Sequence, residues 1–212
     1  VLSSLFCIFM NVVHKLFRKY FKNQYVRVFA GGVMLVLLNI ILNTTDYNGT
    51  GMNIIAQALN GEAKPTAFLL KALFTAITIG CGFRGGEIVP SFFVGATFGC
   101  AMGGLMGLDP GFAAALGMVC FFCGVVNCPL TSLFLSIELF GAHGILLFTI
   151  GCAVSYMLSG YYSLYNEQKI IYSKLRPHYV NLYTNQEIKT KEPGFLEGLI
   201  RIREDDSDDI EE

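Results

Sequence analysis

A glycine pair and a proline divide two long apolar runs near the middle of the chain. Residues 85–90 read GGEIVP, and we predict an apolar helix rich in small residues from Ile88 to Leu108. A proline is tolerated in the first turn of a helix, where its missing N–H is not needed. The unpaired N–H groups and the dipole of such a helix start favour an anion. Because apolar runs flank the break, we expect it at membrane depth, where broken helices line substrate sites.

The composition is that of a membrane protein with several spans. The 212 residues are 53% hydrophobic and 15% charged, with a net charge of -1, which gives no reason to expect a nucleic-acid partner. Basic residues cluster within 14–27 and 169–176, and residues 204–212 are strongly acidic. By the positive-inside tendency both basic clusters face the cytoplasm. We therefore expect an integral protein of the plasma (inner) membrane with a cytoplasmic C-terminal tail.

The seven cysteines all lie in apolar segments, which argues against a disulfide framework. Cys120 and Cys123 have the spacing of a redox pair, and a membrane thiol redox protein is one alternative function. Because the two lie among apolar residues of one predicted helix, we favour simple packing. His143 has no neighbours that would complete a metal site, and we expect neither a metal nor a cofactor.

The chain is predicted to be all-α, with broken and re-entrant helices. The segment Met52–Leu59 is too short to cross a bilayer and is expected to be re-entrant. Gly95 and Gly99 should let two helices approach closely. A transmembrane domain is predicted over 1–178 and a polar, disordered cytoplasmic tail over 179–212. The nine predicted helices span about 1–21, 29–42, 52–59, 66–82, 88–108, 112–126, 130–140, 145–158 and 162–175.

Several of these residues resemble the motifs of the CLC chloride channel and transporter family. Residues 86–90 are similar to the family's GxFxP signature, with Gly86 and Pro90 in the fixed positions. The other matching stretches, in chain order, are Lys71-x-x-x-Thr75, GFRGG at 82–86, Gly124-x-x-Asn127-x-Pro129-Leu130-Thr131, Glu138 and Leu164-Tyr165. The helix order and spacing agree with the family over about 1–175.

The resemblance implies a fold of two inverted repeats and a last helix, assembled as a homodimer with one pore in each subunit. The chain is similar to the second repeat and the last helix, so the first repeat of the same protein becomes an expected partner. The implied function is transport of chloride or fluoride across the lipid bilayer, as a channel or in exchange for protons, and not an enzymatic reaction. A non-transporting membrane scaffold half-subunit is a further alternative.

The resemblance also implies the site residues. The backbone N–H groups at Gly86, Glu87 and Ile88, with the hydroxyl of Tyr165, would bind the anion. Ile88 replaces the usual aromatic residue. Glu87 resembles the family's fluoride/proton-exchanging branch, in which GEVTP stands where this chain has GEIVP. Structural roles in the same motifs fall to Lys71, Gly85, Pro90, Pro129 and Glu138.

Each assignment has a simpler interpretation. Glu87 could only stabilise the start of a helix, which is worth roughly 0.3–1 kcal/mol at an exposed end. At membrane depth, however, an ionised carboxylate is costly unless it is paired, protonated or functional. Tyr165 could be an aromatic residue of the membrane interface. For Lys71 and Glu138 we favour structural pairing or backbone contacts over a direct role in transport.

Overall fold

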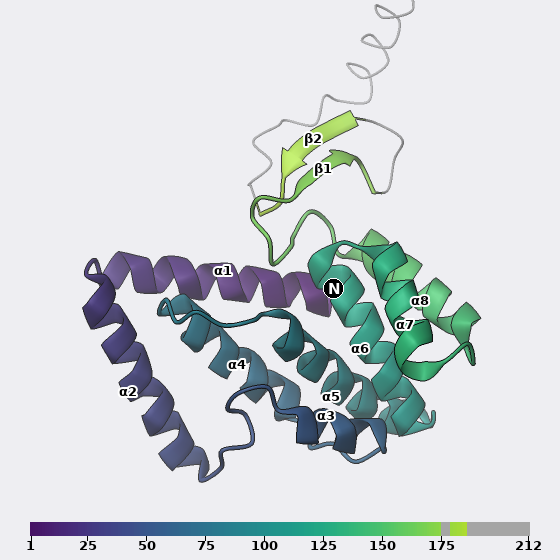
Figure 1. The fold of residues 1–212 in the computed structure, drawn as a ribbon, viewed down its shortest axis with the longest axis horizontal. Helices are drawn as coiled ribbons and strands as arrows, with labels where there is room; N and C mark the ends of the chain where they lie inside the picture. Colours follow the sequence, from purple (N-terminus) through teal and green to yellow (C-terminus); the bar gives the residue numbers. More distant parts are fainter. Residues whose placement is uncertain (175–178, 186–212) are drawn as a thin grey trace, which may run out of the picture.

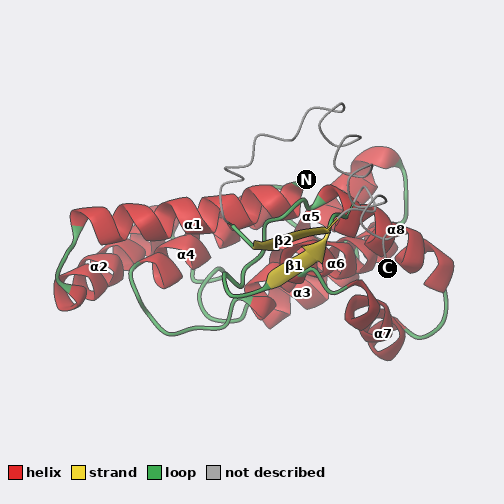
Figure 2. Cartoon of the chain, turned by 90° about the horizontal axis from the view of Figure 1, so that it is seen from above, coloured by secondary structure: helices red, strands yellow, loops and turns green. Residues whose placement is uncertain are grey.

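The computed structural model describes residues 1–174 and 179–185, and these contain eight helices and one two-stranded hairpin (Figure 1). The helices and strands in chain order are α1 (Leu2–Tyr20), α2 (Gln24–Leu42), α3 (Met52–Leu59), α4 (Ala67–Gly80), α5 (Ile88–Met106), α6 (Pro110–Val126), α7 (Pro129–Phe140), α8 (Ile145–Leu158), β1 (Lys169–Tyr172) and β2 (Tyr179–Tyr183). Figures 1 and 2 place α2 and the α7–α8 pair at opposite ends of the molecule, with α4, α5 and α6 between them.

Most helix ends fall where glycine, proline or asparagine interrupts an apolar run. The predicted bounds of α3 and α8 are confirmed, and the others differ by a few residues. Helix α6 begins at Pro110 instead of Phe112, because the Asp109 carboxylate accepts a hydrogen bond from the Phe112 N–H at 2.9 Å and so caps the helix. Helix α2 begins earlier than predicted, at Gln24, where the Asn23 side chain accepts from the Tyr25 N–H at 3.0 Å.

Helices α5 and α6 form the most extensive helix pair, and glycines make their close approach possible. A Cβ atom on Gly99 would lie 2.3 Å from the carbonyl oxygen of Ala113, and one on Gly117 would lie 2.5 Å from that of Gly95. No larger residue fits at these positions without moving backbone. The expected role of Gly95 and Gly99 in close helix packing is therefore confirmed.

Two helices, α2 and α5, are long and apolar enough to cross a membrane, by length and composition. Four shorter helices, α4, α6, α7 and α8, are also apolar. Large side chains of α2 point outward, with Ile40 and Ile41 70% and 76% exposed. An apolar helix with an outward apolar surface suits lipid or further protein, and not water.

The predicted last helix at 162–175 is wrong. The structure instead has a loop after Gly160, whose φ of +59° ends the helical run, and then the antiparallel pair of β1 and β2. In β1, Ile170 is buried whereas Ile171 and Tyr172 are exposed. The β-branched residues Ile170 and Ile171 favour a strand. Strand β2 falls in the predicted tail and pairs across the predicted boundary at 178, and residues 186–212 lie outside the described residues.

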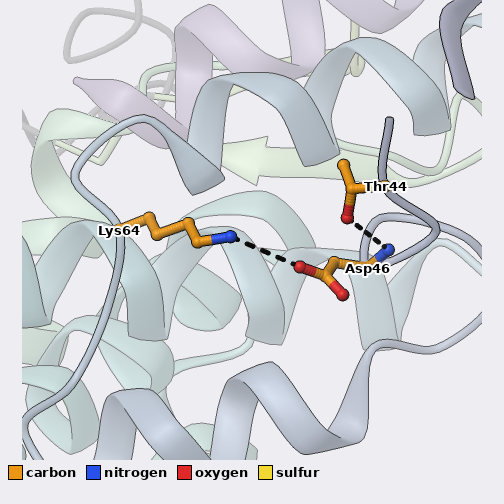
Figure 3. A network of polar contacts seen from close by, with 3 residues as sticks. All are labelled: Thr44, Asp46 and Lys64. Atoms are coloured by element: carbon orange, nitrogen blue, oxygen red, sulfur yellow. Dashed lines mark hydrogen bonds and ion pairs between the residues drawn. The ribbon is translucent and has the colours of Figure 1, made fainter. Parts of the chain in front are cut away.

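The loop between α2 and α3 is held by two lysines. Lys64 forms an ion pair with Asp46 at 3.5 Å, and the Asp46 N–H donates to the Thr44 hydroxyl at 3.2 Å (Figure 3). The second lysine, Lys71 of α4, is only 1% exposed. Its ammonium donates to the carbonyl oxygens of Tyr47 at 3.0 Å and Gly49 at 2.6 Å. The buried lysine therefore fixes this loop against the core.

Candidate anion site

The break between α4 and α5 is anchored at its first half only. The Arg27 side chain of α2 donates through Nε to the Cys81 carbonyl at 3.2 Å, and the Phe83 N–H donates to the Thr78 carbonyl at 3.2 Å. Within the described residues, Arg84, Gly85 and Gly86 make no hydrogen bond at all. Hydrogen bonds therefore fix the part of the break next to α4, whereas none fixes the part next to α5.

Gly85 and Gly86 face open space. A Cβ atom on either would meet no atom within 4 Å, and neither has a positive φ. Neither contact nor backbone geometry inside the described part of the chain therefore requires a glycine at these positions. The small residues leave the start of α5 accessible to something outside this chain.

Helix α5 begins at Ile88, with Glu87 as the residue before it. The first N–H groups of a helix have no partner within the helix. Here no side chain or carbonyl among the described residues accepts from the N–H groups of Glu87, Ile88 or Val89. Pro90, which is buried, has no N–H to satisfy. Free donors at the positive end of the helix dipole are suited to bind an anion.

The Glu87 side chain is half-buried and caps no N–H group of its own helix. The part of the chain that the structure describes offers its carboxylate no hydrogen bond and no ion pair. Ile88 is 37% exposed beside it. An acidic group without a partner, next to free N–H donors, can respond to a bound anion or proton.

Tyr165 lies in the loop after α8, and its segment is tied to the end of α6. The Val125 carbonyl accepts from the Leu164 N–H at 3.0 Å and from the Ser163 hydroxyl at 3.1 Å. Leu164 packs against a cluster that includes Cys7 of α1 and Val94 of α5. The Tyr165 ring is 43% exposed, and its hydroxyl has no hydrogen-bond partner among the described residues. Tyr165 is therefore held by its backbone while its hydroxyl stays available.

Asn127 organises this attachment, a role that its place in the sequence motif did not indicate. Its backbone is left-handed, with φ 59°, and ends α6. Its side-chain N–H donates to the Tyr162 carbonyl at 3.0 Å, and its oxygen accepts from the Ser159 hydroxyl at 3.1 Å and from the Lys174 ammonium. The signals in the sequence are its motif position and an amide next to Cys128 and proline in an apolar stretch. One side chain thus joins α6, α8 and the Tyr165 segment.

Lys174 completes the attachment. Its ammonium donates to the Ser159 hydroxyl at 2.7 Å and lies 4.4 Å from the centre of the Tyr156 ring. Burial lowers the pKa of Lys174 to about 8. Lys174 therefore ties the chain after β1 to the ends of α6 and α8.

Most of the remaining predicted residues contribute to the fold instead of the candidate site. Lys71 makes the backbone contacts that were expected of it. Pro129 is the first residue of α7. Glu138 is exposed, and no ion-pair partner for it exists among the described residues, so the expected pairing is not found. Cys123 is fully buried and donates to the Cys152 carbonyl at 3.4 Å, which is a packing contact.

Comparison with known proteins identifies the family. The family described as "Voltage gated chloride channel" matches residues 1–160. A "Chloride/fluoride channel protein" of Pseudomonas syringae pv. tomato is 34% identical over 176 residues, which cover 79% of this chain and 39% of the relative. An "H(+)/Cl(-) exchange transporter ClcA" of Vibrio cholerae serotype O1 is 25% identical over 184 residues, with the same two coverages.

A solved structure agrees with these sequences. The crystal structure of a CLC-type fluoride/proton antiporter matches with a TM-score of 0.74 and 32% identity, over 77% of this chain and 42% of the other. The chain therefore spans about two fifths of the relatives it matches. The predicted fold class, an all-α polytopic membrane protein of this family, is confirmed, apart from the small hairpin. The chain belongs to the voltage-gated chloride channel family, the CLC family of the sequence motifs.

Proposed function

We propose that the protein containing this chain transports small anions, chloride or fluoride, across a membrane. The observation that carries the proposal is the start of α5, where N–H groups of Glu87 and Ile88 have no acceptor among the described residues and the adjacent Gly86 has open space before it. The names of the relatives, a chloride/fluoride channel, a proton/chloride exchanger and a fluoride/proton antiporter, support the same class of substrate.

The site uses backbone donors from Gly86, Glu87 and Ile88, and the Tyr165 hydroxyl as a further donor. Backbone N–H groups suit this role because they carry no charge of their own, so an anion can both enter and leave. The Asn127 attachment holds the Tyr165 segment close to α1 and α5. Transport changes no covalent bond in this account, so the protein is not an enzyme.

Glu87 gives the site a means to exchange anions for protons. An ionised carboxylate repels a nearby anion, whereas the neutral acid does not and can donate a hydrogen bond. Proton occupancy and anion occupancy at adjacent points therefore depend on each other, and an exchanger requires a coupling of this kind. We accordingly favour exchange over a passive channel.

The assembly that goes with this function is also a proposal. The chain spans about two fifths of its relatives, so a first repeat of the same protein would supply the other half of each pore. A homodimer in the plasma (inner) membrane with a cytoplasmic C-terminal tail fits the basic residues at 14–27 and 169–176. The exposed apolar residues of α2 and α7 leave surface for lipid, for the first repeat and for a second subunit.

The test is transport by the whole protein in liposomes. We expect efflux of chloride, of fluoride, or of both under an imposed gradient, accompanied by proton movement in the opposite direction. Liposomes loaded with each anion separately, beside protein-free liposomes, would identify the substrate. Anion flux without proton movement would contradict exchange, and no anion flux at all would contradict the proposal and favour a scaffold role.

A further inference from the structure

A polar cavity of about 470 Å³ lies between the second half of α1 and the loop and hairpin after Tyr165. Three basic residues on one side of α1, His14, Lys15 and Arg18, form one wall. The opposite wall includes Glu167 and, from the end of the hairpin, Asn185. The cavity is separate from the start of α5, and nothing in the proposed transport uses its basic residues.

The cations of this wall have no acidic partner within the described residues. No carboxylate there is within ion-pair distance of Lys15 or Arg18, both of which are exposed. Lys169 adds a further cation, because its ammonium lies 5.6 Å from the centre of the Tyr183 ring, which also lines the cavity. Against the charges of Lys15, Arg18 and Lys169, Glu167 is the single acidic residue among the described residues of the lining. The cavity therefore has an excess of positive charge.

Several neutral groups of the lining already make hydrogen bonds within the chain. The Asn11 amide donates to the Cys7 carbonyl at 3.0 Å, and the Asn185 amide donates to the Ser163 carbonyl at 2.7 Å and to Asn166 at 2.6 Å. The Thr184 hydroxyl donates to the Tyr165 carbonyl. The strongest donors left to a ligand are the cationic groups of Lys15 and Arg18, which favour an occupant with several negative charges.

We propose that the acidic segment of this chain at 204–212 binds in the cavity between α1 and the hairpin. The segment reads EDDSDDIEE, so seven of its nine residues carry carboxylates. The described chain ends at Asn185, which itself lines the cavity, so the acidic segment is tethered at its own binding site. The connection from 186 to 203 is 18 residues long. A chain of that length with random-coil dimensions spans roughly 20–25 Å on average, and a short tether gives a local concentration in the millimolar range.

Binding there would place carboxylates beside Asn166, the residue after Tyr165. A tethered polyanion at that point would compete with anions approaching Tyr165, and this consequence alone rests on the proposed function. The binding itself does not, so its test measures contact and not transport.

The test is zero-length carbodiimide crosslinking of the whole protein, with the linked peptides identified by mass spectrometry. We expect the Lys15 amine to link to carboxylates of 204–212 several-fold more than the Lys22 amine does. Lys22 is the matched control, since it belongs to the same basic cluster and is exposed but does not line the cavity. Equal linking of the two lysines would reduce the effect to general attraction and overturn the proposal.

A pair of variants tests the cavity directly while both crosslinking partners stay in place. Arg18→Gln should lower the Lys15 link several-fold, and Lys22→Gln should leave it unchanged. Added salt should weaken the link, since it screens exposed charges. An Arg18→Gln protein with the full Lys15 link would overturn the proposal.

Two further experiments distinguish the acidic segment of the same chain from a second chain and from lipid. In a mixture of isotopically heavy and light protein, the links should join residues of the same chain, and a majority of mixed links would overturn the intramolecular assignment. The Lys15 link should also persist in vesicles that contain phosphatidylglycerol. Its loss there, but not in vesicles of phosphatidylcholine alone, would assign the cavity to lipid phosphate instead.

Discussion

The loops before α3 and α5 resemble each other in sequence but differ in how they are held. Both are rich in glycine and both lead into the start of a helix. The loop before α3 is closed, since Lys71 binds the Tyr47 and Gly49 carbonyls and the Tyr47 ring is buried. The loop before α5 is open, since Arg84, Gly85 and Gly86 make no hydrogen bond within the described residues. The first loop serves the fold, whereas the second leaves donors and space for a ligand.

The largest expected effect is a difference in stability between substitutions at a packed glycine, Gly99, and at an open one, Gly86. Gly99→Val should cost about 3 kcal/mol of stability or more, because its side chain would collide with the Ala113 carbonyl of α6. Gly86→Val should leave thermal unfolding of the whole protein almost unchanged, because nothing lies in front of it. The same Gly86 variant should bind anion weakly by calorimetry. Normal anion binding by Gly86→Val would contradict an open anion site.

The next effect concerns the closed loop. Lys71→Met would leave the carbonyl oxygens of buried Tyr47 and of Gly49 without their donor and should destabilise the protein by about 1–3 kcal/mol. Lys64→Met is the control, because the exposed Lys64–Asp46 pair should contribute at most about 1 kcal/mol. Thermal unfolding of both variants measures the difference, and anion affinity should not change in either. Equal stabilities would show that Lys71 does not hold the loop.

Substitution of Tyr165 should weaken anion binding by a similar free energy but leave the stability unchanged. Removal of its hydroxyl in Tyr165→Phe should weaken anion binding by about 1–3 kcal/mol, the range for a hydrogen bond to a charged group. Tyr162→Phe provides the control, since Tyr162 is similarly exposed and lies in the same loop. Calorimetry with chloride and with fluoride measures both variants. Unchanged binding in Tyr165→Phe would return Tyr165 to the role of an interface aromatic residue.

The smallest effect is a dependence on pH that comes from Lys174. Its pKa in the folded protein is about 8, below the ordinary lysine value of 10.5. Between these two values the unfolded chain binds more protons than the folded one, so the stability should rise as the pH increases through this window. Thermal unfolding at several pH values should show the rise, and Lys174→Met should remove that part of it. A rise of the same size in the variant would show that another group is responsible.

The sequence was most informative about helices and their ends. Asn127, Gly107 and Asp109 mark helix ends by local chemistry, and local chemistry is what a sequence displays. The hairpin was missed because β1 has only four residues, and a signal that short does not outweigh the expectation of a last helix. Short strands gain their stability from a partner, which in this case lies beyond 178.

The sequence predicted the type of site, a helix break with free donors, but not the contacts that hold the Tyr165 segment beside it. GGEIVP at 85–90 indicated a helix break with free donors, and the structure has such a break. The attachment of the Tyr165 segment could not be foreseen, because Asn127 and Lys174 are 47 residues apart and meet only through the packing of α6 and α8. Whether Glu87 and Tyr165 act on an anion remains a prediction.

Proton movement in liposomes that contain the Glu87→Gln protein tests the open site most directly. Glutamine keeps the size of the side chain and its ability to donate a hydrogen bond, but it cannot release a proton. We expect anion-driven proton movement to be abolished, with fluoride and with chloride, while anion binding survives because the N–H groups of α5 remain. Glu138→Gln, at an exposed glutamate of α7, should behave as the unmodified protein. Normal proton movement in Glu87→Gln would contradict the account and reduce Glu87 to a residue at the start of a helix.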